Sequence, residues 1–323
     1  MLKAGKSKLL IVPVVFIGFL TSVMHADVDI SGFVDVIYQD VQKENSSFGM
    51  GAFEIDFETE ISESAVFEGA VVVEEDGAAP GQTLVDFSIL KEKIGLQAGL
   101  IDIPFGIDCL TFAACDRKLV SSPLTTELMM DGGWGDVGIN FHGKDSMLNY
   151  NLFVVNGMGV DVDASSAPVN QMTDNNNSKS YGGRIGVSPA ERIEVGFSYA
   201  RGPYLDDNSE KLWQRSGADI RFCAGEFKLQ GEYISGKEDL PGRGENKHSG
   251  FYVQVLAGIF KNVYGVLRLG QWKPDAGDAV KRTTIAAGYG LDENTSLRCE
   301  YIMNNKAPEA DNNVLSLQAV VSF

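Results

Sequence analysis

The chain has 323 residues, of which 44% are hydrophobic and 22% are charged, and its formal net charge at pH 7 is −17. So acidic a protein repels the phosphate backbone of DNA and RNA, which excludes nucleic acid as a partner.

The first 26 residues predict a secretory signal peptide. Lys3, Lys6 and Lys8 form a positive start, an apolar run follows from Leu9 to Leu20, and cleavage after Ala26 fits the small residue there. The run is shorter than the roughly 20 residues of a spanning helix, so an inner-membrane anchor is not expected. Removing three lysines and no acid takes the net charge from −17 to −20 for residues 27–323.

From Asp27 to Phe323 the sequence alternates apolar and polar residues in stretches of about ten, the pattern of a transmembrane antiparallel β-barrel. Short and long connections between the stretches also alternate, which predicts about sixteen strands with both ends of the chain on the periplasmic side. The predicted short turns are 62–65, 92–93, 144–147, 189–192, 225–226, 261–262 and 292–294, and the predicted outward loops are 42–50, 75–83, 103–134, 157–180, 203–214, 236–249, 273–280 and 305–313. Half-apolar strands can cross the inner membrane without being trapped there, so the expected location is the outer membrane of a Gram-negative-type bacterium.

The early strands predict an acidic inner wall. Phe53, Ile55 and Phe57 alternate with carboxylates, and the face that does not meet lipid must line the lumen. The predicted acidic pore-lining residues are Asp29, Asp35, Glu54, Asp56, Glu58, Glu60, Glu68 and Asp86.

The third outward connection, 103–134, is the longest and is expected to fold into the barrel as a constriction loop. It is rich in Leu, Phe and Met, which favour burial over projection into water, and Ser122 to Met130 has helical character. Arg117 and Lys118 are expected to face the acidic wall. An extracellular lid or a subunit contact is the alternative. The charged residues of this loop are Asp108, Asp116, Arg117, Lys118, Glu127 and Asp131.

Two of the four cysteines, Cys109 and Cys115, lie in this loop, and export permits a disulfide between them. Four free thiols are the alternative. Cys223 is expected to face the lumen and Cys299 the lipid, so these two cannot pair with each other.

Short motifs over roughly residues 94–200 resemble known porins. The run Leu96–Gly106, followed by the long loop and Asp136–Ile139, resembles the constriction-loop region of Gram-negative porins. Segments 153–157, 175–177, 183–186 and 188–189 are similar to the phosphate-selective porin O and P family. The resemblance implies a sixteen-stranded barrel, usually a homotrimer, with the third loop bent into the pore. That family uses an arginine ladder and lysine clusters for phosphate, whereas this lumen has an acidic half, so phosphate is not the expected solute.

The late strands predict a largely basic wall, which Asp219, Glu232 and Glu300 temper. A lumen carrying so many charges must hold water, because unpaired charges in a dry interior cost too much free energy. The net acidity of the lining predicts a mild cation preference. Pairing of these charges across neighbouring strands, which would only stiffen the wall, is the alternative. The predicted basic pore-lining residues are Arg184, Arg221, Lys228, Arg268 and Arg298.

These features predict an outer-membrane porin for passive diffusion of small hydrophilic solutes or ions, in contact with outer-membrane lipid. The alternatives are a barrel sleeve around an electron-transfer or export partner, and an outer-membrane enzyme or adhesin. His142 has no Gly-x-Ser-x-Gly elbow to accompany it, so an enzyme is not expected. Neither a cofactor nor a metal site is predicted, although Asp161, Asp163 and Asp174 leave calcium binding open.

Overall fold

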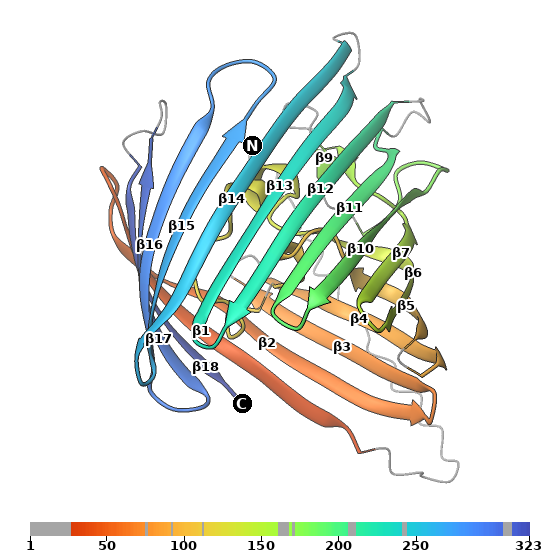
Figure 1. The fold of residues 1–323 in the computed structure, drawn as a ribbon, viewed down its shortest axis with the longest axis horizontal. Coiled ribbons are helices and arrows are strands. Elements are labelled where there is room, and N and C mark those ends of the chain that lie inside the picture. The colour runs from red at the N-terminus through yellow and green to blue at the C-terminus, as the bar shows by residue number, and fades with distance from the viewer. Residues whose placement is uncertain are drawn as a thin grey trace, which may run out of the picture.

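The computed structural model describes residues 27–74, 77–91, 93–111, 113–160, 168–169, 172–205, 211–240, 244–305 and 312–323. The predicted signal peptide lies outside these residues. Sixteen antiparallel strands form one closed barrel (Figure 1). The barrel strands are β1 Asp29–Val41, β2 Ser47–Ser62, β3 Ala65–Glu74, β4 Gly77–Leu90, β5 Ile94–Asp102, β6 Gly135–Asp145, β7 Leu148–Val155, β10 Ser180–Ala190, β11 Ile193–Pro203, β12 Leu212–Ala224, β13 Phe227–Leu240, β14 Gly244–Phe260, β15 Val263–Lys273, β16 Val280–Gly290, β17 Thr295–Asn304 and β18 Val314–Ser322.

The remaining elements lie in two long connections. The 3-10 helix η1 (Asp108–Leu110) and the helix α1 (Leu124–Met129) belong to the segment between β5 and β6. The short strands β8 (Gly159–Val160) and β9 (Pro168–Val169) pair with each other between β7 and β10. Within the described ranges, no helix is long and apolar enough to cross a membrane.

Pairing of β1 with β18 closes the barrel. The register runs from Phe33 opposite Ser322 to Val41 opposite Val314, and the backbone of Phe323 exchanges hydrogen bonds with Gly32. Closure removes both sheet edges, which would otherwise expose unpaired backbone groups to hydrocarbon.

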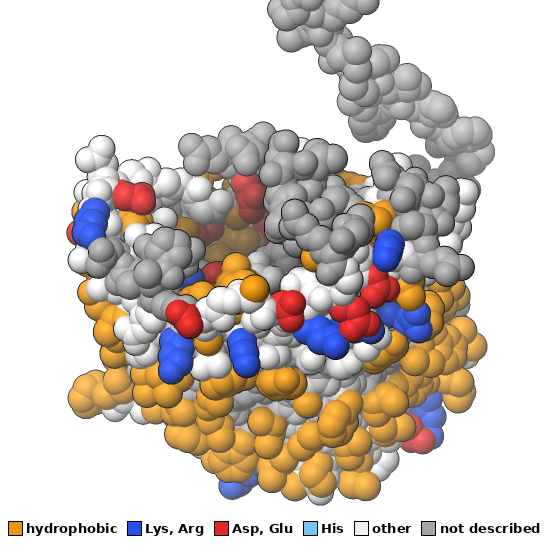
Figure 2. Space-filling view, turned by 90° about the horizontal axis from the view of Figure 1, so that it is seen from above, with side chains coloured by type: hydrophobic (Ala, Val, Ile, Leu, Met, Phe, Trp, Pro, Cys, Tyr) orange, Lys and Arg blue, Asp and Glu red, His pale blue; other side chains and the backbone are white. Residues whose placement is uncertain are grey.

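The two faces of each strand meet different surroundings. On the outside, Ile185 is 48% exposed and Phe197 is 61% exposed, whereas the neighbouring Arg184 and Ser198 are buried inside the barrel. Figure 2 shows hydrophobic side chains gathered in a band on the face of the barrel in view, edged by charged side chains toward the rim. The alternation read from the sequence therefore separates an apolar exterior from a polar interior.

The predicted short turns agree with the structure over the residues it describes, which leave out Glu92 of the turn 92–93. Strand ends such as Ser62, Asp145 and Ala224 lie at or within a residue of their predicted limits. The predicted outward loops were too long in several places. The clearest case is 236–249, where β13 runs to Leu240 and β14 begins at Gly244. Polar residues extend this hairpin because they pair across it: Glu245 bridges to Lys237, and Asn246 donates to Glu238.

The native cysteines test the two faces directly. Cys223 lines an interior cavity beside Lys228, whereas Cys299 lies on the outer face beside Leu297 and Leu317. In phospholipid vesicles, we expect a charged maleimide to modify Cys223 at least about tenfold faster than Cys299, because a charged reagent does not readily enter hydrocarbon. Mass spectrometry of single-cysteine variants measures both rates. Equal rates in vesicles, with equal rates for the unfolded chain as the control, would contradict the assigned faces.

Candidate functional site

The segment 103–134 lies against interior side chains of the barrel. It leaves β5 after Asp102 and returns to β6 at Gly135, and its two ends are joined by the hydrogen bond from Ile103 N to Trp134 O at 2.7 Å. Asp136 fixes the base of the returning strand, because its carboxylate accepts from Val137 N and Gly157 N, both at 2.7 Å.

An apolar cluster holds one side of this segment. Phe105 and Met130 are completely buried, and Trp134 packs edge-on against Phe153 and Trp213 with ring centroids 5.4 and 5.1 Å apart. The cluster fills part of the interior with hydrophobic side chains. The lumen is therefore not polar throughout, and the apolar residues of the segment 103–134 account for its apolar part.

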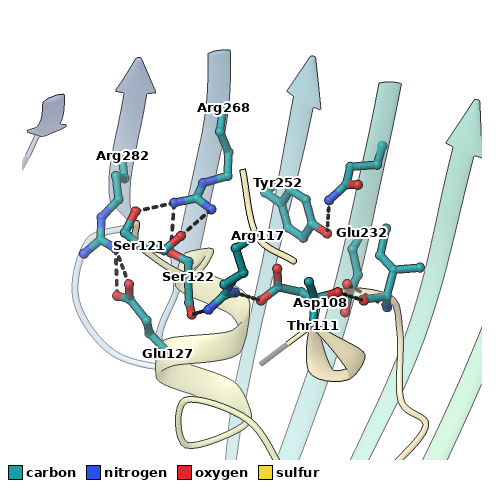
Figure 3. Close-up of polar contacts among 12 residues, drawn as sticks. Asp108, Thr111, Arg117, Ser121, Ser122, Glu127, Glu232, Tyr252, Arg268 and Arg282 are labelled. Carbon is teal, nitrogen blue, oxygen red and sulfur yellow. Dashed lines mark hydrogen bonds and ion pairs between the residues drawn. The ribbon is translucent and has the colours of Figure 1, made fainter. Parts of the chain in front are cut away.

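Charged wall residues hold the other side (Figure 3). Arg268 of β15 donates to Ser121 Oγ at 2.6 Å and to the carbonyl oxygens of Ser121 and Ser122, each at 3.0 Å. Glu300 of β17, which is fully buried, accepts from the backbone N–H groups of Val120 and Ser121 at 2.8 and 3.1 Å. These charge-assisted bonds are worth about 1.5–3 kcal/mol each.

Helix α1 and the segments that flank it are fixed in the same way. Arg282 of β16 donates to both carboxylate oxygens of Glu127 at 2.7 Å, as Figure 3 shows. Arg215 of β12 donates to the carbonyl oxygen of Met129 at 3.0 Å. Arg298 of β17 donates to the carbonyl oxygen of Ala114 at 2.6 Å. The anchors therefore come from strands spread over the late wall.

Gly106 permits a further close contact with the wall. Its φ is 65°, a conformation that favours glycine, and a Cβ there would overlap the Glu232 carboxylate. The Gly106 amide donates to Ser198 Oγ at 2.9 Å, and the Ile107 amide donates to Glu232 at 3.3 Å. Glu232 was expected inside the barrel, but no local pattern of residues predicted this contact.

Charge pairing occupies much of the rest of the late wall. Arg184 bonds to Asp219 and to Glu194, the latter at 2.8 Å, and Arg215 pairs with Glu238. Three of the predicted basic wall residues line an interior cavity of about 350 Å³: Arg221, Lys228 and Arg268. Arg117 and Lys118 of the segment 103–134 line the same cavity. Asp108 and Asp116 also line this cavity.

The early wall lines a different cavity, of about 580 Å³. Seven carboxylates and no lysine or arginine lie among its lining residues. Of the predicted acidic residues, Asp29, Glu54, Asp56, Glu58 and Glu68 lie here, joined by Glu74 and Asp102.

The three other predicted acidic residues lie apart from this cavity. Asp35 is buried in the wall, where it accepts from Gln318 Nε2 and from Ala52 N, both at 2.7 Å. Asp86 lies 3.0 Å from His142 Nε2 and accepts from Gln97. Glu60 is exposed near the end of β2.

The expected orientation of Arg117 and Lys118 was wrong. Arg117 pairs with Asp108 of its own segment at 2.9 Å, and Lys118 lies over the ring of Tyr264 on β15, 5.5 Å from its centroid. Both therefore face the late wall. Partial burial lowers the pKa of Lys118, and the charges of Arg298 and Lys228 lower that pKa further. Asp131, the last charged residue of the segment, is exposed at a positive φ of 52°.

The expected bridge between Cys109 and Cys115 is not formed, and both are free thiols. Cys109 is fully buried in the apolar cluster with Phe105 and Trp134, whereas Cys115 lies at a cavity beside Lys118. Burial raises the pKa of both thiols. The different packing of the two side chains explains the missing bond.

No group of three or more His, Cys, Asp and Glu residues that could hold a metal ion occurs within the described ranges. Asp161 and Asp163, named above for calcium, lie outside these ranges. Asp174 binds Lys179 and the Asn176 amide instead.

A family model described as Gram-negative porin matches residues 14–307. An uncharacterized protein of Aquifex aeolicus (strain VF5) is 23% identical over 309 residues, covering 78% of this chain and 70% of its own length. The family matched is the broad one, so the phosphate-selective porin O and P family stays a resemblance.

Solved structures share the fold at low identity. The anion-selective porin from Comamonas acidovorans has a TM-score of 0.68 and 13% identity, covering 92% of this chain and all of its own. OmpF of Salmonella typhi, in complex with daunomycin, has a TM-score of 0.67 and 12% identity over 92% of this chain and 98% of its own. OmpT of Vibrio cholerae, in a trimer form, has a TM-score of 0.66 and 9% identity over 92% and 99%.

The anchors predict how the segment 103–134 responds to mutation. Arg268→Ala removes the donors to Ser121 and Ser122, so we expect amide hydrogen exchange in residues 113–134 to speed up at least about tenfold, the effect of losing bonds of this strength. Exchange measured by mass spectrometry on the reconstituted barrel tests this. Lys228→Ala is the matched control, because Lys228 lines the same cavity without a hydrogen bond to the segment in the described part of the chain. Unchanged protection in Arg268→Ala would show that Arg268 does not anchor the segment.

Proposed function

The chain belongs to the Gram-negative porin family, and from this we infer that it forms a water-filled channel for passive diffusion of small hydrophilic solutes or ions, with a mild preference for cations and no enzymatic activity. It lies in the outer membrane as a multi-pass β-barrel of sixteen strands.

The observation that carries the cation preference is the cavity along the early wall. Its lining has seven carboxylates and no basic side chain. No salt bridge within the described ranges involves Glu54, Asp56 or Glu58. A wall of carboxylates without basic partners attracts cations into the lumen and repels anions.

The late wall offsets this charge only in part. Arg184, Arg215 and Arg282 pair with carboxylates, and Arg268 and Arg298 donate to backbone carbonyls of the segment 103–134. A guanidinium paired with a carboxylate contributes little long-range field, whereas Arg268 and Arg298 are bonded to neutral carbonyls and keep their net charge. Together with Arg221 and Lys228, they are the wall cations that support the alternative of weak selectivity.

The segment 103–134 is the proposed constriction. Its anchors on β12, β15, β16 and β17 hold it across the interior in one position. A segment held in this way reduces the cross-section of the channel and thereby sets the size of solute that passes.

We also propose a homotrimer, which the resemblance implies and which the trimer form of the similar Vibrio cholerae protein supports. Light scattering of the detergent-solubilised protein, corrected for bound detergent, is expected to give three times the mass of one mature chain, residues 27–323. A mass of one chain across several mild detergents would contradict the trimer.

Neutralising the unpaired carboxylates is expected to shift selectivity. In planar bilayers under a tenfold KCl gradient, the triple variant Glu54→Gln, Asp56→Asn, Glu58→Gln is expected to move the reversal potential toward chloride by about 10 mV or more, out of about 59 mV per tenfold gradient for an ideally selective pore.

The variant Glu63→Gln, Glu191→Gln is the control, because both residues are exposed in short turns outside the lumen. It is expected to leave the potential unchanged. An unmoved potential in the triple variant would show that these carboxylates lie off the permeation path, and absence of conductance in the parent protein would overturn the channel itself.

A further inference from the structure

Two glycines lie on neighbouring strands of the inner wall, behind the helix α1. Gly250 of β14 pairs with Ile234 of β13 and with Trp272 of β15. Gly270 of β15 pairs with Tyr252 of β14. Directly paired residues of antiparallel strands point to the same side of the sheet, so each glycine has large side chains beside it on the inner face. Together the two glycines leave a recess in the wall, called here the glycine recess.

The backbone conformation does not explain why these positions are glycine. Neither Gly250 nor Gly270 is among the described glycines that have a positive φ. Glycine in the interior of a strand costs about 0.5–1 kcal/mol relative to alanine, and it often marks a place where another part of the chain comes close. The reason for both glycines therefore lies in the space in front of the wall.

The helix α1 occupies that space. A Cβ on Gly250 would lie 3.0 Å from Thr125 Cγ2 and 3.3 Å from Met129 Sδ, and a Cβ on Gly270 would lie 4.0 Å from Leu124 Cδ1. Leu124, Thr125 and Met129 are all buried. The helix therefore packs onto the wall where two side chains are missing, which brings it closer to the wall backbone than side chains there would permit.

The other side of α1 faces open space. Leu128 is 46% exposed, and Glu127 is partly exposed where it binds Arg282 (Figure 3). Because the segment 103–134 lies inside the barrel, a helix that moves off the wall moves into the lumen. The distance between α1 and the wall therefore determines how much of the lumen stays open.

We propose that Gly250 and Gly270 determine the width of the channel, because the glycine recess sets how close α1 lies to the wall. This proposal rests on the channel function proposed above. Arg215 and Arg282 hold α1 through long side chains, which can follow a helix that shifts. The packed contact at the recess cannot adjust in this way, because the interior of a protein has little free space. The arginines thus keep α1 attached, whereas the glycines set its depth.

Variants of the recess in planar bilayers and in vesicles test the proposal. Gly250→Val puts a branched side chain into the space of Thr125 and Met129, so the single-channel conductance is expected to fall about twofold as α1 moves into the lumen. In vesicle-swelling measurements with sugars of increasing size, the largest sugars are expected to lose the most. Gly270→Leu is expected to act in the same way against Leu124. The milder Gly250→Ala is expected to lie between Gly250→Val and the parent.

The matched control is Gly49→Val on β2, because a Cβ on Gly49 would meet nothing within 4 Å. It is expected to keep the conductance and the solute cutoff of the parent. Parental conductance and cutoff in both Gly250→Val and Gly270→Leu would overturn the proposal. An increased conductance would also overturn it, because α1 would then have left the lumen.

A spin-label distance measures the position of the helix without relying on permeation. Labels are placed at Leu128→Cys and at Gln82→Cys in a barrel whose native cysteines are replaced by serine. Gln82 lies on β4, which is across the ring of sixteen strands from β14 and β15. Gly250→Val is expected to shorten the distance between the labels by about 2 Å, roughly the reach of the added side chain.

The two measurements separate this proposal from the channel function. An unchanged label distance in Gly250→Val would overturn the role of the glycine recess even if the conductance fell. A shortened distance with parental conductance and cutoff would show that α1 does not limit the width of the channel. Absence of conductance in the parent protein would instead overturn the channel function itself.

Discussion

Every backbone N–H and C=O group in the hydrocarbon region must be paired within the protein, and the rest of this structure follows from that constraint. The sheet satisfies it by joining β1 to β18, with the C-terminal Phe323 bonded to Gly32. Once the sheet is closed, each strand has one face in lipid and one in the interior, so a half-apolar sequence suffices to cross the membrane. The same closure creates an enclosed interior. The side chains on the inner face determine which parts of that interior are packed and which can hold water.

The two walls of the interior use their charged side chains differently. Along the late wall, cationic side chains meet carboxylates or the carbonyl oxygens of the segment 103–134, as Arg268 meets Ser121 and Arg282 meets Glu127. Along the early wall, carboxylates such as Glu54 and Asp56 line a cavity whose described lining has no basic side chain. Buried charges are stable only when paired or solvated, so the paired wall can be dry while the acidic wall requires water. This difference between the walls agrees with an aqueous path along the early strands.

The sequence predicted the strands and short turns well because both depend on local chemistry. Period-two alternation defines the faces, and the residues of the turns after Ser62 and Asp145 end strands locally. The length of the β13–β14 hairpin was missed because Lys237, Glu245 and Asn246 look like loop residues until their cross-strand partners are known. The contacts of the segment 103–134 were missed for the same reason, because their partners lie even further away in the sequence. Glu300 lies some 180 residues from Val120, and no local pattern tells which wall residue a loop will meet.

The arginines that anchor the segment 103–134 also bear on the proposed charge selectivity of the lumen. An interior segment that borders water on one side cannot be fixed by apolar burial alone. Hydrogen bonds and ion pairs from the wall must therefore hold the side without apolar contacts. Arginine suits this role because one guanidinium donates several such bonds. Each arginine used in this way has its charge partly screened by the carbonyl or carboxylate groups that it binds. If an anchor is released without being removed, its positive charge becomes available to ions at the moment when the constriction loosens. With the cation preference proposed above, the channel would then become wider and less selective for cations together, so the proposal couples the position of the segment 103–134 to the charge preference of the lumen.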